Sequence, residues 1–196
     1  MSLLNDKSIR LAYNYTSIVQ QMVNRVITWL PTNVNSEFII ICIGTDRSTG
    51  DSLGPFTGTL LQDKTLRNIT VYGNLHDPVH ALNLEKHIMM IRHKYNNPFI
   101  IAIDACLGKM SSVGDVIAGT GSILPGAAVN KQLPAVGDMF ITGVINVSGF
   151  LEYTVLQSTR LSLVLDMAKT IAQIVEAIDR QITLQKFKAT IEKRIL

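Results

Sequence analysis

Two aspartates follow hydrophobic segments of this sequence, at places where an α/β enzyme holds its reactive groups. Asp51 lies in a glycine-punctuated loop after residues 37–43, and Asp104 directly follows residues 99–103. Ligands of open α/β sheets bind beyond the carboxyl ends of the strands. Because two carboxyl groups that share a site do not both ionise easily, one of them keeps a proton. Such a pair can activate water with one member and protonate a leaving group with the other.

Other interpretations of these aspartates stay open from the residues alone. The same two carboxylates could hold a divalent metal ion, with His76 or His80 as further ligands of a metal-dependent hydrolase. Alternatively, Asp51 caps a helix that begins near Leu53, and Asp104 accepts hydrogen bonds from loop amides. The residue types alone support a functional pair and these structural roles equally.

Further candidate chemistries are weaker. The glycines of residues 44–54 spell neither a phosphate loop nor a dinucleotide-binding fingerprint. Cys106 lies two residues after Asp104, but a nucleophile needs an oriented histidine base, and no serine-hydrolase elbow occurs at a strand-helix junction. Histidines cluster near one expected helix, where solvated or capping roles are favoured over zinc binding. They are His76, His80, His87 and His93.

The elements that must position the two aspartates alternate between helices and strands. Helical spacing predicts a helix over residues 8–30, and Pro55 can start another. Asp77 and Pro78 predict the start of a helix that runs to about residue 95. Strands are predicted over residues 37–43, 69–73, 99–103, 113–117, 122–124 and 140–147, and one long helix or two from residue 151. This alternation predicts an α/β fold, a three-layer sandwich with a mostly parallel twisted sheet flanked by helices.

Length and composition favour one domain over residues 1–196. We expect an N-terminal helix and connector (1–36), a core (37–178) and a basic C-terminal helix (179–196). Residues 180–196 hold five basic residues and one acidic residue, a net charge of +4, within a chain of +3. A solvated helix end is favoured over contact with nucleic acid or an acidic partner. The terminal helices could pack within one chain or across a homo-oligomer.

Localisation is expected to be cytoplasmic. No apolar run reaches the length of a membrane helix, the N-terminus lacks the pattern of a signal peptide, and two cysteines make no disulfide framework.

Two motifs resemble a known family. Residues 43–55 (IGTDRSTGDSLGP) and 102–107 (AIDACL) are similar to the sporulation protein YyaC family, over roughly residues 37–178. That family resembles the spore germination protease and, more distantly, the hydrogenase maturation endopeptidases. Residues 121–131 also resemble a Pro-Gly-containing loop of the germination protease.

The resemblance implies a phosphorylase/hydrolase-like sandwich and an unusual acid peptidase that acts in sporulation or germination. Its proposed catalytic pair falls on Asp51 and Asp104, with Asp46 as a substrate-contacting or supporting residue. A protein or peptide substrate is implied, with small acid-soluble spore proteins as candidates, in the spore or the sporulating cell. A non-catalytic, spore-associated binding protein of the same fold is the alternative.

The same resemblance bears on the other site residues. Gly44, Gly50 and Gly121 would let a substrate backbone approach closely. From the sequence itself, His76 and His80 lie near a strand end and are expected to line the crevice, with His76 contacting the substrate. The hydrogenase endopeptidases carry acidic nickel-binding residues and a later histidine. Residues 137–155 contain no histidine here, which argues against nickel binding and favours a metal-free aspartate site. We expect no cofactor.

Overall fold

The computed structural model of this protein describes residues 7–33, 35–125, 133–149 and 151–195. Within this part of the chain, six strands form one sheet in the order β1-β5-β6-β4-β2-β3. The strands are β1 (Ser8–Ala12), β2 (Phe38–Cys42), β3 (Ile69–Tyr72), β4 (Phe99–Gly108), β5 (Asp115–Thr120) and β6 (Met139–Val147). The α-helices are α1 (Ile18–Val26), α2 (Leu53–Gln62), α3 (Leu84–Lys94), α4 (Glu152–Gln157) and α5 (Leu161–Ile195).

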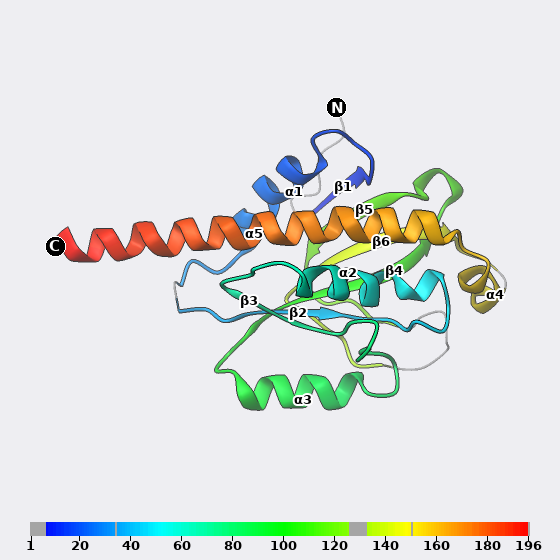
Figure 1. The fold of residues 1–196 in the computed structure, drawn as a ribbon, viewed down its shortest axis with the longest axis horizontal. Coiled ribbons are helices and arrows are strands. Elements are labelled where there is room, and N and C mark those ends of the chain that lie inside the picture. Colours follow the sequence, from blue (N-terminus) through cyan, green and yellow to red (C-terminus); the bar gives the residue numbers. More distant parts are fainter. Residues whose placement is uncertain (1–6, 34, 126–132, 150, 196) are drawn as a thin grey trace.

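The sheet is mixed and mostly parallel. Strands β3, β2, β4 and β6 pair in parallel, whereas β5 is antiparallel to both β6 and β1. Helices α1, α2 and α5 lie on one face of the sheet and α3 lies on the other (Figure 1). The predicted three-layer α/β fold class is therefore confirmed.

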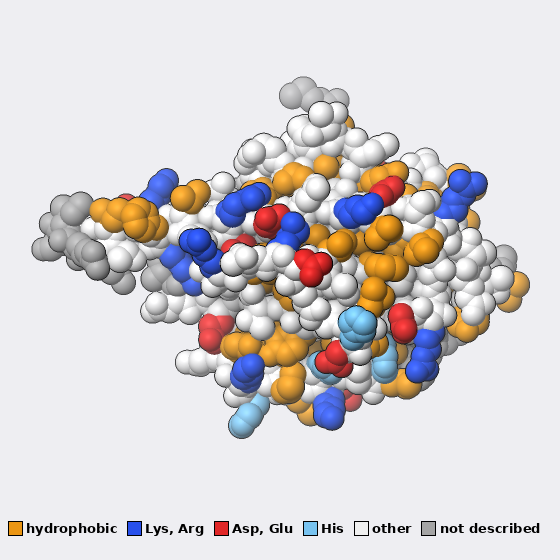
Figure 2. Space-filling model, viewed as in Figure 1, with side chains coloured by type: hydrophobic (Ala, Val, Ile, Leu, Met, Phe, Trp, Pro, Cys, Tyr) orange, Lys and Arg blue, Asp and Glu red, His pale blue; other side chains and the backbone are white. Residues whose placement is uncertain are grey.

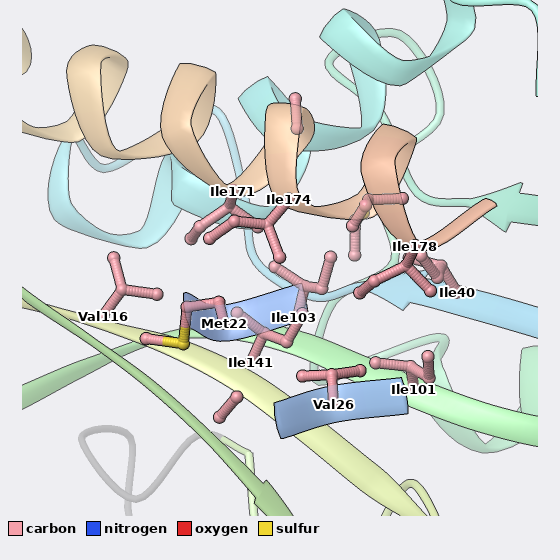
Figure 3. Close-up of a cluster of buried hydrophobic side chains, with 14 of the residues drawn as sticks. Met22, Val26, Ile40, Ile101, Ile103, Val116, Ile141, Ile171, Ile174 and Ile178 are labelled. Carbon is pink, nitrogen blue, oxygen red and sulfur yellow. The ribbon is translucent and has the colours of Figure 1, made fainter. Parts of the chain in front are cut away.

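Strand β2 shows why the sheet needs cover on both faces. All five of its residues are buried, and they alternate between two hydrophobic cores. Phe38, Ile40 and Cys42 face the core with α1, α2 and α5, whereas Ile39 and Ile41 face the core with α3. The larger core is closed by isoleucines of α5, among them Ile171, Ile174 and Ile178, which pack over strand residues (Figure 3).

Helix α5 crosses the sheet and continues beyond it (Figure 1). Its buried Asp179 accepts hydrogen bonds from the backbone N–H groups of Arg67 (3.0 Å) and Asn68 (2.8 Å), which fixes the turn before β3. The projecting end carries exposed hydrophobic side chains, including Leu184 and Phe187, beside basic ones (Figure 2). Over the described residues, we find no helix with the length and apolar character that a membrane crossing requires.

Two sequence-based predictions of helices are wrong in part. Residues 8–12 form the edge strand β1, and the helix α1 begins only at Ile18. The segment Ser-Ile-Arg-Leu-Ala alternates apolar and polar residues, so Ile9 and Leu11 pack on the core while Arg10 stays exposed. The apolar residues of this segment therefore fit both a strand-like alternation and a helical spacing. Pairing with β5 favoured the strand.

The helix predicted from Asp77 begins instead at Leu84. Val79 forms an isolated parallel bridge with Ile43, and the Asn74 side chain accepts hydrogen bonds from the backbone N–H groups of two following residues. These contacts hold residues 74–83 in an irregular path. Residues 122–124 likewise form no strand, because only Ile123 makes a bridge there. The strand predicted over 113–117 lies slightly later, as β5.

Candidate active site

The connections of the sheet create a crevice between β2 and β4. From β2 the chain continues through α2 to β3, on one side of the crevice, whereas from β4 it continues to β5 and β6, on the other side. The connections that leave β2 and β4 therefore diverge in opposite directions along the sheet. Open α/β sheets bind ligands at such a switch point. The loop after β2 carries Asp51, and β4 carries Asp104.

Close backbone packing holds Asp51 at this crevice. It lies in a short 3-10 turn, Gly50–Ser52, that leads into α2. Gly44 has a φ of +139°, and a side chain there would overlap the Asp51 carbonyl oxygen. That oxygen also accepts a hydrogen bond of 3.1 Å from the Thr45 backbone N–H. A side chain at Gly54 would overlap the carbonyl oxygen of Ile43. The two glycines therefore let the loop fold back against the end of β2.

Asp104 is held by the sheet itself. Strand β2 ends beside Ile103, so Asp104 lies where β4 continues, paired with Thr142 of β6. Its side chain is 8% exposed, and one carboxylate oxygen accepts a hydrogen bond of 2.8 Å from the Ala105 backbone N–H. The strand prediction from sequence stopped at residue 103, whereas β4 extends to Gly108 and makes Asp104 part of the strand.

The environment disfavours two negative charges at the site. Burial raises the pKa of Asp51 from 3.8 to about 6, against the opposing effect of the Thr45 backbone N–H. Burial and the nearby Asp51 carboxylate raise the pKa of Asp104 well above its usual value. Both shifts act in the direction that favours a proton shared by the pair, which is the arrangement that acid-base catalysis by two carboxyl groups uses.

Two hollows meet at the aspartates. The first hollow, of about 370 Å³, is lined on its apolar side by Leu107, Ile123, Leu124 and Phe140. The second hollow, of about 310 Å³, is lined by Ser48, His80, Leu82 and Tyr153 among others. Asp51, Asp104 and Leu156 line both. Both hollows therefore give access to the aspartate pair.

The structure brings together only some of the residues that the sequence suggested. Gly44 and Asp46 line the second hollow with the aspartate pair. Gly50 is buried, and a side chain there would collide with Leu156 and Ile145, so its role is packing. His76 and Gly121 are exposed and do not appear among the described residues that line either hollow. Residues 126–131 of the predicted Pro-Gly loop lie outside the described residues.

Sequence reasoning missed other residues of the site. Ser48 belongs to the quoted motif, yet nothing in its spacing marks it. Leu156 carries only a helical apolar signal, although it borders both hollows. Cys106, by contrast, was considered from the sequence as a nucleophile; it lines the first hollow, and burial raises the pKa of its thiol. Across the described residues, no three His, Cys, Asp or Glu side chains gather closely enough to hold a metal ion.

These features define an α/β protein with a paired-carboxyl site at the switch point of its sheet. Residues 10–174 match the family described as a protein of unknown function, DUF1256, and the chain belongs to this family. It is 54% identical to the uncharacterized protein YyaC of Bacillus subtilis (strain 168) over 142 residues, which are 72% of this chain and 69% of that protein. The resemblance to the YyaC family is thereby confirmed.

Solved structures of two proteases are also similar. The [NiFe] hydrogenase maturation protease HycI from Thermococcus kodakarensis KOD1 shares 15% identity, with a TM-score of 0.49 over 74% of this chain and 93% of that one. The hydrogenase 3 maturation protease shares 16% identity, with a TM-score of 0.44 over 72% of this chain and 90% of that one.

Proposed function

We propose that this protein is a peptidase of the germination-protease type, acting in sporulation or germination, that hydrolyses peptide bonds with Asp51 and Asp104. The observation that carries the proposal is the pair of poorly solvated carboxyl groups at the meeting point of two hollows. If Asp51 only capped helix α2, neither a second carboxyl group nor a hollow beside it would be required. The resemblance of the two aspartate motifs to those of the germination protease supports the same function.

The difference in burial suggests the two roles. Asp51, the less buried member, accepts a proton from a water molecule that attacks the peptide carbonyl. Asp104, the more buried member, donates its proton to the departing amide nitrogen. After the bond breaks, the two carboxyl groups again hold one proton between them, because one proton was taken up and one was given away.

The test compares the wild type with the Asp51→Asn/Asp104→Asn double variant. Both are incubated with an extract of small acid-soluble spore proteins, and the products are read by intact mass. We expect discrete fragments from the wild type, and a rate at least about 10³-fold lower from the double variant. Circular dichroism of the variant verifies that its fold survives.

Three other results would change the proposal. Equal cleavage by both proteins would remove the aspartate pair from the mechanism. Cleavage that a chelator abolishes would favour a metal-dependent hydrolase. Absence of cleavage, together with a stoichiometric partner that binds wild type and double variant equally, would favour a non-catalytic binding protein.

A further inference from the structure

The end of helix α5 that extends beyond the sheet has two faces of different character. On one face, Ile178 and Ile182 are buried, and the Lys186 amino group lies 6.0 Å from the centre of the Phe38 ring. These three helix residues recur every fourth position and mark the face that turns toward the sheet. No described residue after Ile182 is buried. The last turns of α5 therefore continue without cover from the core (Figure 1).

Large apolar side chains form a stripe along the opposite face of this projecting end. The outer stripe consists of Leu184, Phe187 and Ile191, which are 51%, 64% and 41% exposed. Spacings of three and four residues place them on one side of the helix, about half a turn away from Ile182. The outer stripe is therefore not a continuation of the core. An apolar patch that is surrounded by polar residues is typical of an interaction site.

The charge of the projecting end indicates the chemistry of what covers the stripe. Residues 180–196 have a net charge of +4, and the remainder of the chain has −1, because the total is +3. Arg180 and Lys188 are exposed one turn before and one turn after Leu184. Arg180 lies 3.7 Å from the Glu176 carboxylate, whereas no acidic residue lies within three positions of Lys188. The stripe is thus accompanied by positive charge, which complements an anionic surface.

We propose that the projecting end of α5 binds the surface of a bilayer that contains anionic phospholipids, with the outer stripe inserted among the lipids. Helices that combine an apolar face with Lys and Arg lie in the plane of such surfaces, and each basic side chain adds electrostatic attraction. Long basic side chains beside the stripe keep their charges at the head groups while their stems contact apolar surroundings. The sequence alone favoured a solvated helix end, and the exposure of the stripe is the observation that changes this interpretation.

Other occupants fit the charge or the stripe less well. If the stripes of two copies packed on each other, two segments of net charge +4 would lie side by side and repel. A protein groove that encloses the helix would have to bury Arg180 and Lys188, and a buried charge is costly unless it is well paired. Nucleic acid would contact the charges but leave the stripe exposed to water. A lipid surface accommodates both features.

Sedimentation with lipid vesicles tests this binding with the full chain. The vesicles contain either phosphatidylcholine alone or equal parts of phosphatidylcholine and phosphatidylglycerol, in about 0.05 M or about 0.5 M NaCl. We expect binding to the vesicles with phosphatidylglycerol at the lower salt concentration. Binding should be at least about tenfold weaker without phosphatidylglycerol or at the higher salt concentration.

Three variants separate the contributions of the stripe and of the charge. Leu184→Ser/Phe187→Ser leaves the charge unchanged and should weaken binding at least about tenfold. Lys188→Gln leaves the stripe intact and should weaken binding about fivefold. Met89→Ser/Met90→Ser is the matched control, because these side chains are 63% and 42% exposed on α3, which covers the other face of the sheet. This control should bind like the wild type, and urea unfolding of each variant verifies that its stability is unchanged.

A fluorescent residue in the stripe reports insertion directly. The wild type contains one tryptophan, Trp29, so the spectrum of Phe187→Trp minus that of the wild type isolates the new indole. We expect its emission to shift to shorter wavelength on vesicles with phosphatidylglycerol, and to be quenched when brominated phospholipids are included. An unchanged spectrum on bound protein would overturn the insertion of the stripe.

Each remaining contrary result overturns a defined part of the proposal. Binding that Leu184→Ser/Phe187→Ser leaves unchanged would show simple attraction of a basic segment, without insertion. Equal binding to both kinds of vesicle would overturn the role of charge. Absence of binding to either kind would overturn the proposal as a whole, and sedimentation equilibrium of the wild type and the double variant would then show whether a second copy covers the stripe instead. These outcomes are independent of peptide hydrolysis at Asp51 and Asp104.

Discussion

Asp51 and Asp104 reach the same crevice by different structural means. Asp104 belongs to β4, where pairing with β6 fixes the backbone on which its side chain stands. Asp51 belongs to a turn whose position depends on Gly44 and Gly54, because any larger residue there would overlap backbone atoms. The sheet therefore supports one carboxyl group through many shared hydrogen bonds, and the loop supports the other through a few close contacts. The loop side should be the more easily disrupted of the two.

Replacement of Gly44 tests this difference with the largest expected effect. In Gly44→Ala, the new methyl group meets the Asp51 carbonyl oxygen, and the φ of +139° is strained for alanine. We expect peptide hydrolysis to fall about 100-fold or more as Asp51 moves, because small misplacements of reacting groups are costly. The free energy of unfolding should fall by about 3 kcal/mol. Urea unfolding and kcat/KM measure the two effects.

Gly114→Ala is the matched control for strain alone. Gly114 has a φ of +95°, but the nearest atom to an added methyl group lies at 3.4 Å, in the Tyr13 ring. A loss of about 1 kcal/mol without a change in hydrolysis is expected. Equal losses of activity in the two variants would mean that the loop is no more sensitive than the remainder of the fold.

Burial of the Asp51 carboxyl group predicts that the free energy of unfolding depends on pH. The pKa of Asp51 is 3.8 in the unfolded chain and about 6 in the folded one. Below pH 3.8 both states are protonated and no penalty arises. As the pH rises toward 6, the unfolded state loses its proton first, so the folded protein becomes less stable, by about 3 kcal/mol in total. This pH-dependent loss of stability is absent from Asp51→Asn, because asparagine does not ionise.

Urea unfolding of the wild type and of Asp51→Asn at pH 3.5, 5 and 7 measures this contribution of Asp51 to stability. The free energy of unfolding of Asp51→Asn, relative to wild type, should increase across this series and level off above pH 7. A difference that stays constant with pH would show that Asp51 is solvated and that its carboxyl group is not perturbed by burial.

The sequence was most informative where the pattern of apolar residues fitted one type of secondary structure. The segment 38–42 is apolar at every position, which only a strand covered on both faces explains at that length, and β2 is buried throughout. The same reasoning predicted the general α/β class and brought both aspartates to one edge of the sheet, although Asp104 lies within β4, next to the end of β2, and not after the strand. These inferences depend on residue type and order alone.

The predictions failed where contacts distant in sequence decide the local path. Residues 77–83 were predicted as helix, but the bridge between Val79 and Ile43 holds them in an irregular path. Four of them line the second hollow, namely Pro78, His80, Ala81 and Leu82. Residues 122–124 were predicted as strand, yet Ile123 and Leu124 line the first hollow. Both errors thus fall on the walls of the site, where local preference and function are expected to disagree. No local pattern could reveal that the Ser48 hydroxyl is buried without a hydrogen-bond partner among the described residues.

The smallest expected effect concerns the strand side of the comparison. Cys106 follows Asp104 on β4 and lines the first hollow, so it is the obvious rival nucleophile. Burial raises the pKa of its thiol, which leaves little of the reactive thiolate at neutral pH. We therefore expect Cys106→Ala to change kcat/KM less than about threefold, within the range that small changes in an apolar wall produce. A second measurement treats the wild-type protein with iodoacetamide and follows alkylation of the Cys106 thiol by intact mass. Hydrolysis by the alkylated protein is then compared with hydrolysis by the untreated protein. Loss of hydrolysis in Cys106→Ala, with activity retained in Asp104→Asn, would show that the Cys106 thiol is the reactive group of β4. Loss of hydrolysis in Asp104→Asn, with activity retained in Cys106→Ala, would show that the reactive group is the carboxyl group that the sheet holds in place.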